Sequence, residues 1–273
     1  MPSTWARRYL DHLHLEGGPP TLEWLTRFGE AHLPNVPFEN VTSLLRRLLV
    51  EDDGPVPPLD LDQLLDNWEH GEGGGVCFEV ATMVSTLLPQ LGYEAYPILG
   101  AITFPASHHA VVVNLPEGPH MVDLGCGAPL SAPIPLDRVS EYERAGLQYR
   151  LRPDLATMTC VQDRMIEGQW TPFCHYDLRP AEPELRETGY QRHNTPGESW
   201  VVGGIVLVSY LDNGNIAQIR DGKFTLHTAT GKHSRPITSR LDYTRTVRDD
   251  LHLPNVPIGL GLEALEQITG EEV

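Results

Sequence analysis

The chain has 273 residues, of which 40% are hydrophobic and 21% charged, and its formal net charge is −17 at pH 7. This length exceeds what one small core needs, so two or three packed domains are expected. The acidic balance argues against a nucleic-acid partner and against an anionic membrane surface, because both select a basic face. The longest apolar stretch, Ile205 to Leu211, is far shorter than the roughly 20 residues that span a bilayer.

Cysteine and histidine usage narrows the class further. The N-terminus MPSTWARRYLDHLHLEGG lacks the apolar core of a signal peptide. Four cysteines without a CxxC pair predict neither a disulfide framework nor a zinc ribbon, so we expect a reducing, cytoplasmic setting. The 12 histidines are scattered and include no HExxH, and the adjacent His108 and His109 point to opposite faces of a strand. We therefore expect no metal.

The first 90 residues show helical patterns. Residues 21–33 carry apolar side chains at helical spacing behind Thr21, which is suited to an N-cap. Residues 58–68 repeat the pattern after a proline-rich turn, and a third helix is expected from Cys77 to Leu88.

Strand-like alternation begins at Tyr93. Expected strands cover residues 93–104, 108–115, 120–125, 148–153 and 158–178, the last broken by a turn at Glu167-Gly168. Residues 179–200 are polar and interrupted by Pro and Gly, and they read as a long connection or domain border. A second group of strands is expected over 200–237 and a short helix over 259–270. The order predicts an α+β protein of several domains.

Three glycines, Gly73 to Gly75, deliver Cys77 to the first turn of its helix. Backbone N–H groups at a helix N-terminus favour a thiolate, and glycines allow a substrate to approach closely. The alternative is that Cys77 is a small core residue and that the glycines only make a turn.

A nucleophilic cysteine needs a histidine base and a carboxylate that orients it. His109 begins one strand and Asp123 ends the next, and a hairpin turning at Glu117-Gly118 is expected to bring them together. We therefore predict a Cys77–His109–Asp123 triad, with His108 and His120 as alternatives for the base. His120 lies at the wrong end of the hairpin. The alternative to a catalytic triad is that His109 and Asp123 are ordinary exposed residues at the ends of strands.

Four motifs occur in the order found in one enzyme family. These are VPFENV (36–41), GGGVCFE (73–79), HHAVVV (108–113) and VDLGCG (122–127), with WTPFCHYDL and NTPGES further along. Along nearly the whole chain the pattern resembles the arylamine N-acetyltransferases.

The resemblance implies an α+β fold of three domains around a Cys-His-Asp core similar to that of papain-like enzymes. The three domains would be a helical bundle over 1–90, a β-barrel over 91–190 and an α/β lid over 191–273. Acetyl-CoA would acetylate Cys77, and an arylamine, hydrazine or N-hydroxyarylamine would take the acetyl group. Phe38, Phe78 and Cys126 match positions that line the acceptor pocket, although the two phenylalanines also fit an ordinary core. No metal cofactor is implied.

The chain departs from the family pattern around these residues. Gly73 replaces the usual arginine, so Glu39 is expected to lack its partner, and Ala81 replaces a common asparagine. Cys126 replaces a pocket phenylalanine, which opens the pocket to a different or bulkier acceptor. A buried, inert thiol is expected there, and a second reactive thiol is the alternative.

Other functions stay open at this stage. The same triad fits an amide synthase that uses a carrier-bound or different acyl thioester, a thiol hydrolase, or a silent binding protein that keeps the fold. The oligomeric state and the residues that bind CoA are undetermined. Basic side chains available for its phosphates include Lys223, Lys232 and Arg235.

Overall fold

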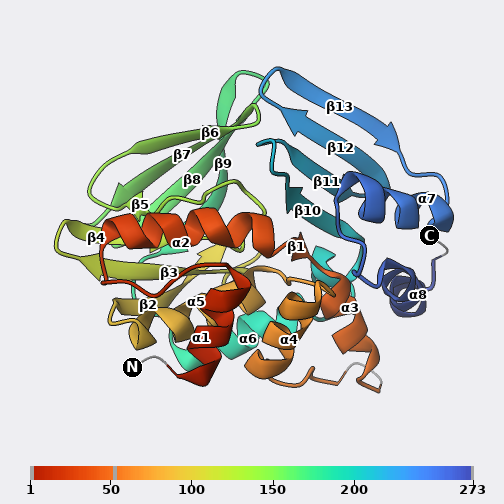
Figure 1. Ribbon diagram of the computed structural model, residues 1–273, viewed down its shortest axis with the longest axis horizontal. Helices are drawn as coiled ribbons and strands as arrows, with labels where there is room; N and C mark the ends of the chain where they lie inside the picture. Colours follow the sequence, from red (N-terminus) through yellow and green to blue (C-terminus); the bar gives the residue numbers. More distant parts are fainter. Residues whose placement is uncertain (1–2, 52–53, 272–273) are drawn as a thin grey trace.

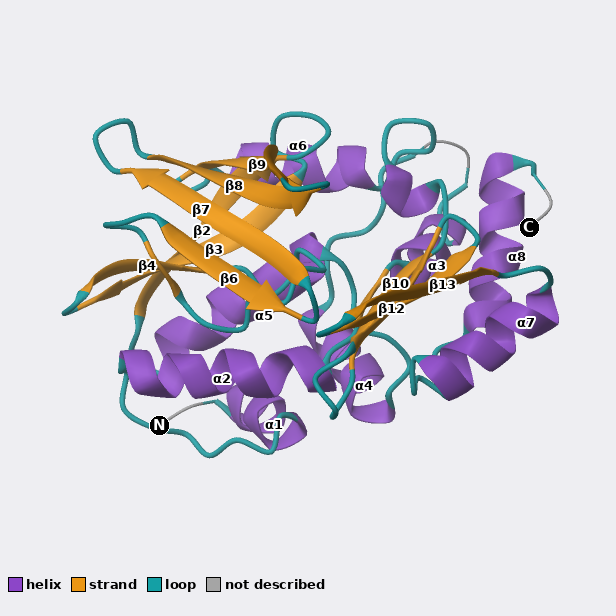
Figure 2. Ribbon diagram, turned by 90° about the horizontal axis from the view of Figure 1, so that it is seen from above, coloured by secondary structure: helices purple, strands orange, loops and turns teal. Residues whose placement is uncertain are grey.

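The computed structural model describes residues 3–51 and 54–271, in which helices flank two antiparallel sheets (Figure 1). Eight strands form one sheet in the order β5-β4-β3-β2-β9-β8-β7-β6, which curls into an incompletely closed barrel (Figure 2). They are β2 (Glu94–Ala101), β3 (His108–Leu115), β4 (Gly118–Val122), β5 (Ile134–Pro135), β6 (Ser140–Arg144), β7 (Leu147–Asp154), β8 (Thr159–Ile166) and β9 (Gln169–Asp177). The α+β prediction is confirmed.

Five strands form the second sheet in the order β1-β10-β11-β12-β13. They are β1 (Phe38–Glu39), β10 (Val206–Tyr210), β11 (Ile216–Arg220), β12 (Lys223–Thr228) and β13 (Gly231–Pro236). The helices are α1 (Thr4–His12), α2 (Leu22–Asn35), α3 (Val41–Leu48), α4 (Leu61–His70), α5 (Cys77–Gln90), α6 (Pro183–His193), η1 (Trp200–Val202), α7 (Arg240–Arg245), η2 (Thr246–Asp250) and α8 (Ile258–Thr269).

The predicted N-terminal helices form where their capping residues stand. The Thr21 side chain accepts a hydrogen bond from the Trp24 N–H at 3.2 Å, as expected of an N-cap. Helix α4 ends at Gly71, whose φ of 69° is the left-handed conformation that favours glycine at a helix C-terminus. Helix α5 packs on β2 and β3 and carries the nucleophile candidate to the edge of the barrel.

Helix α6 is absent from the prediction, which had a connection at residues 179–200. Its start uses Pro183 in the first turn, where a missing N–H costs nothing. The helix buries only Gly189, Tyr190 and His193, so the sequence carries almost no apolar stripe. Gly189 lies against the Ala106 carbonyl, and an added Cβ there would lie 2.4 Å from that oxygen.

Strand β1 joins the N-terminal segment to the C-terminal sheet. Phe38 pairs with Val208 in β10, and the Asn40 amide donates to the Val201 carbonyl at 2.7 Å and accepts from the Val206 N–H at 2.8 Å. The division into domains 1–90, 91–190 and 191–273 stays a prediction, and its outermost residues 1–2 and 272–273 lie outside the described ones. No described helix combines the length and apolar character needed to cross a bilayer.

The β3–β4 hairpin turns one residue earlier than predicted. Leu115 pairs with Gly118 and Val111 with Val122, so Pro116-Glu117 form the turn. Side chains alternate between faces, and this register puts Asp123 on the face that carries the even-numbered residues of β3. His108, and not His109, therefore shares a face with Asp123.

Candidate active site

The glycine loop ahead of Cys77 is shaped by close contacts with the β1 segment. An added Cβ on Gly74 would lie 1.8 Å from the Pro37 carbonyl oxygen, and Gly75 has a φ of 116°. The Trp68 indole donates to the Gly74 carbonyl at 2.6 Å, and the Glu39 N–H donates to the Gly75 carbonyl at 3.1 Å. Only glycine fits this path, which fixes where α5 begins.

Two buried carboxylates, those of Glu39 and Glu79, accept hydrogen bonds from the glycine loop and from the start of α5. Glu39 accepts hydrogen bonds from the Thr42 hydroxyl at 2.6 Å, the Thr42 N–H at 3.0 Å and the Gly74 N–H at 3.0 Å. Thr42 and Gly74 thus take the place of the expected arginine, although burial still raises the pKa of Glu39. Glu79 accepts from the Val76 N–H at 3.2 Å and pairs with Arg46 at 2.6 Å, which satisfies the start of α5.

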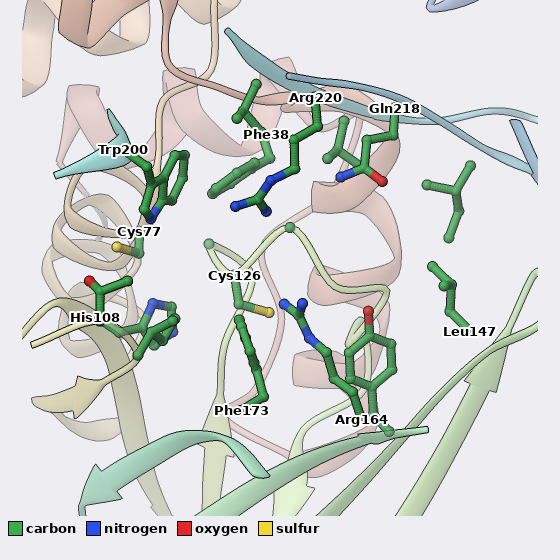
Figure 3. A pocket seen from close by; sticks show the side chains of 18 of the residues that line it. Phe38, Cys77, His108, Cys126, Leu147, Arg164, Phe173, Trp200, Gln218 and Arg220 are labelled. Carbon is green, nitrogen blue, oxygen red and sulfur yellow. The ribbon is translucent and has the colours of Figure 1, made fainter. Parts of the chain in front are cut away.

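Cys77 lies at the end of a cavity of about 290 Å³ between the barrel, the second sheet and the helices (Figure 3). His108 lines the same cavity, and its Nε2 lies 2.8 Å from Asp123 Oδ2. Both members of the pair are buried. Burial favours the neutral ring, but the charges of Asp123 and Cys77 outweigh it and raise the pKa of His108 well above its usual value. The bond to Asp123 leaves Nδ1 of His108 for Cys77.

The predicted contact between His109 and Asp123 is wrong. The His109 ring points to the opposite face of β3 and packs on Phe78, with 5.5 Å between ring centroids. Burial lowers the pKa of His109 to about 3, so this ring is neutral at physiological pH. The sequence itself distinguishes the two histidines. In a hairpin with a two-residue turn, residues on the two strands share a face when their numbers sum to an odd total, which holds for His108 with Asp123 and not for His109.

Tyr176 is a further residue that the sequence analysis missed. Its hydroxyl lies 2.7 Å from Asp123 Oδ2 and 2.7 Å from Gln162 Oε1. One phenolic proton serves one acceptor, so donation to Asp123 requires the Gln162 amide to turn its NH₂ toward Tyr176. In that orientation Gln162, Tyr176 and Asp123 form a chain of hydrogen bonds that ends at His108.

The predicted pocket residues divide between the cavity wall and the core. Phe38 and Cys126 line the cavity together with Trp200, and the rings of Phe38 and Trp200 lie 6.3 Å apart. Burial raises the pKa of Cys126 well above its usual value, which keeps it a neutral thiol. Phe78 is not among the described residues of the wall; it packs behind it against His193, at 5.3 Å between centroids.

Comparisons with known proteins identify the family of the chain. A family model described as N-acetyltransferase matches residues 21–255. An arylamine N-acetyltransferase of Mycolicibacterium smegmatis is 28% identical over 214 residues, which cover 73% of this chain and 74% of that one. An arylamine N-acetyltransferase / N-hydroxyarylamine O-acetyltransferase of Salmonella typhimurium is 26% identical over 64% of this chain and 62% of its own.

Solved structures show the same fold. The arylamine N-acetyltransferase of Mycobacterium marinum has a TM-score of 0.80 at 22% identity, over 96% of this chain and 99% of that one. The same enzyme in complex with CoA has a TM-score of 0.79 at 21% identity, over 97% and 99%. The chain belongs to the arylamine N-acetyltransferase family, and the prediction that it is an acetyltransferase is confirmed. No group of three or more metal-ligating side chains occurs within residues 3–51 and 54–271.

Proposed function

We propose that this enzyme transfers an acetyl group from acetyl-CoA to an arylamine, hydrazine or N-hydroxyarylamine through a thioester on Cys77. The observation that carries the proposal is the buried pair of His108 and Asp123, which lies beside Cys77 at one end of the cavity. We assign the role of the catalytic base to His108 and not to His109.

In the first half of the proposed reaction, His108 takes the Cys77 proton at Nδ1, and Asp123 stabilises the imidazolium that forms. The Cys77 sulfur attacks the acetyl carbonyl of acetyl-CoA, and we assign the stabilisation of the oxygen that becomes negative to the N–H groups of the first turn of α5. The tetrahedral intermediate collapses, the bond to the CoA sulfur breaks, and His108 returns the proton to the departing thiolate.

In the second half, the acceptor nitrogen attacks the acetyl group on Cys77 while His108 takes its proton. The carbon–sulfur bond then breaks and the product leaves. Phe38 and Trp200 supply an apolar wall for an aromatic acceptor beside Cys77. A cavity that admits the amine and excludes water separates a transferase from a hydrolase with the same three residues.

We assign the phosphates of CoA to the outer part of the second sheet. The two lysines of the chain, Lys223 and Lys232, lie there beside Arg220 and line a surface depression that shares Arg220 and His227 with the catalytic cavity. A basic patch on a chain of net charge −17 is suited to a polyanionic donor. All four cysteines are free, which supports a cytoplasmic location.

Intact-protein mass spectrometry after incubation with acetyl-CoA tests the proposal. We expect the wild type to gain one acetyl group and Cys77→Ala to gain none. Cys126→Ala, which removes the other thiol on the cavity, should still gain one. Adding an arylamine should discharge the acetyl-enzyme much faster than buffer alone. Failure of acetyl-CoA to label Cys77 would overturn acetyl transfer, and discharge at the same rate by water would identify a hydrolase.

A further inference from the structure

Arg164, on β8, projects into the catalytic cavity. Residues along β8 alternate between faces, so Asp163 points away from the cavity and is occupied there by Arg150 and Arg152, at 2.8 Å to each. Within the described residues, Arg164 forms no ion pair, and its Nε is shut off from solvent without a hydrogen-bond partner. None of the described residues that line the cavity is acidic, so this cation has no carboxylate beside it there.

Aromatic contacts compensate this burial only in part. The Arg164 Cζ lies 3.1 Å from the centroid of the Phe173 ring and 5.9 Å from that of Tyr149. Such contacts return less than the cost of removing a guanidinium from water. Burial lowers the pKa of Arg164, but a guanidinium remains protonated at neutral pH.

A second guanidinium faces Arg164 from the opposite wall. Arg220 extends from the end of β11 past Trp200, with its Cζ 5.5 Å from that ring, and Figure 3 shows both arginines reaching into the pocket. Its ion-pair partner is Asp221, at 3.5 Å on the exposed side of the sheet. After burial, the Arg220 charge is among the influences that lower the pKa of Arg164. An anion between the two arginines would relieve this repulsion.

We propose that Arg164 binds a carboxylate carried by the acceptor, so that the preferred acceptors are aromatic amines with an acid group on the ring. The inference rests on the proposed function, because it places the amine at Cys77 and the acid at the other side of the same cavity. A planar carboxylate matches the two parallel N–H donors of a guanidinium. The small Cys126 side chain, beside Arg164 in Figure 3, leaves room for the ring between them.

Two other anions reach the same cavity in the proposed reaction. The phosphates of CoA are strongly hydrated and suit the exposed lysines of the second sheet better than a half-buried arginine stacked on Phe173. An acyl group with its own carboxylate is the second source. Arg164 would pair with an anion whether it comes from the acceptor, from CoA or from the acyl group, so the experiment must separate these three sources.

The test compares 4-aminobenzoate with its uncharged analogue 4-aminobenzamide as acceptors. In a double-displacement reaction, kcat/KM for the acceptor reports only the second half-reaction. We expect the wild type to prefer the acid, Arg164→Met to lower kcat/KM for the acid by about 10- to 100-fold with little change for the amide, and Arg164→Lys to restore part of the loss. Arg152→Met, a charge removal on the outer face of the barrel, is the matched control and should change neither.

The outcomes separate the sources of the anion. Equal use of acid and amide by the wild type, or an equal loss for both in Arg164→Met, overturns the proposal. Slower acetylation of Cys77 by acetyl-CoA in Arg164→Met assigns the arginine to CoA. Faster labelling of wild-type Cys77 by malonyl-CoA than by acetyl-CoA, lost in Arg164→Met, assigns it to the acyl group.

A binding measurement keeps this inference distinct from the proposed function. Thermal unfolding of Cys77→Ala with 4-aminobenzoate needs no turnover. We expect the acid to raise Tm more than the amide does, and Arg164→Met to abolish the difference. If acetyl-CoA fails to label wild-type Cys77 while this difference persists, the acetyl donor is wrong and the anion site stands. Equal Tm shifts for acid and amide overturn the anion site.

Discussion

Exchanging His108 for Gln tests the assignment of the base most directly. Glutamine keeps an amide that can donate to Asp123, but it has no group that takes a proton at neutral pH. General-base catalysis contributes roughly 10²- to 10⁴-fold, which corresponds to about 3–5 kcal/mol of transition-state stabilisation. His108→Gln should therefore acetylate Cys77 slower by that factor, measured by intact-protein mass spectrometry under single-turnover conditions. The protein itself should stay folded by circular dichroism.

His109→Gln is the matched substitution on the opposite face of the same strand. The ring there is buried against Phe78, so the expected effect is on stability: roughly 1–3 kcal/mol, or a Tm lower by about 2–10 °C. Its acetylation rate should remain close to that of the wild type. Loss of acetylation in His109→Gln with retention in His108→Gln would refute the register argument and the assignment of His108.

Three further predictions follow from the same structure. Tyr176→Phe should slow Cys77 acetylation by about 3- to 10-fold, since a hydrogen bond to a charged group is lost, and an unchanged rate would remove Tyr176 from the site. Gly74→Ala should destabilise the fold by more than about 3 kcal/mol in urea titrations because its Cβ meets the Pro37 carbonyl, whereas Gly259→Ala, whose Cβ meets nothing within 4 Å, should be neutral or stabilising by up to about 1 kcal/mol; equal effects would contradict this contrast. Three buried histidines have a pKa of about 3, which burial sets: His32, His109 and His193. Each binds a proton near pH 6.5 when unfolded, so the unfolding free energy should decrease as pH falls from about 6.5 to about 3; a constant value from pH 7 to pH 4 would contradict neutral burial.

Local sequence rules predicted the elements whose signals are self-contained. The helix after Thr21, the helix from Cys77 and the β3–β4 hairpin all follow from capping, spacing and turn residues. Helix α6 was not predicted because only three of its residues are buried, and they do not form an apolar stripe. The position of His193 in the cavity wall was therefore not predicted from the sequence either.

The sequence predicted that Asp123 contacts a histidine of the β3–β4 hairpin, and the structure shows this contact with His108 and not with His109. Side-chain alternation decides between His108 and His109, and the prediction used only their distance from the turn. Arg164 could not be found from the sequence, because an arginine in a strand reads as a solvated charge. Its burial depends on how β8 curls against Phe173 and Tyr149.

The pairing of β1 with β10 also sets the time at which a nascent chain can become active. Phe38 and Cys77 leave the ribosome long before Val208 is synthesised, and the segment that carries them lacks one wall until β10 arrives. Trp200 and Arg220, which also line the cavity, are likewise synthesised long after Cys77. Because both ends of the chain build one cavity, a partly translated chain holds a thiol without a substrate site. The cavity that holds Cys77 is therefore complete only after most of the chain has been synthesised.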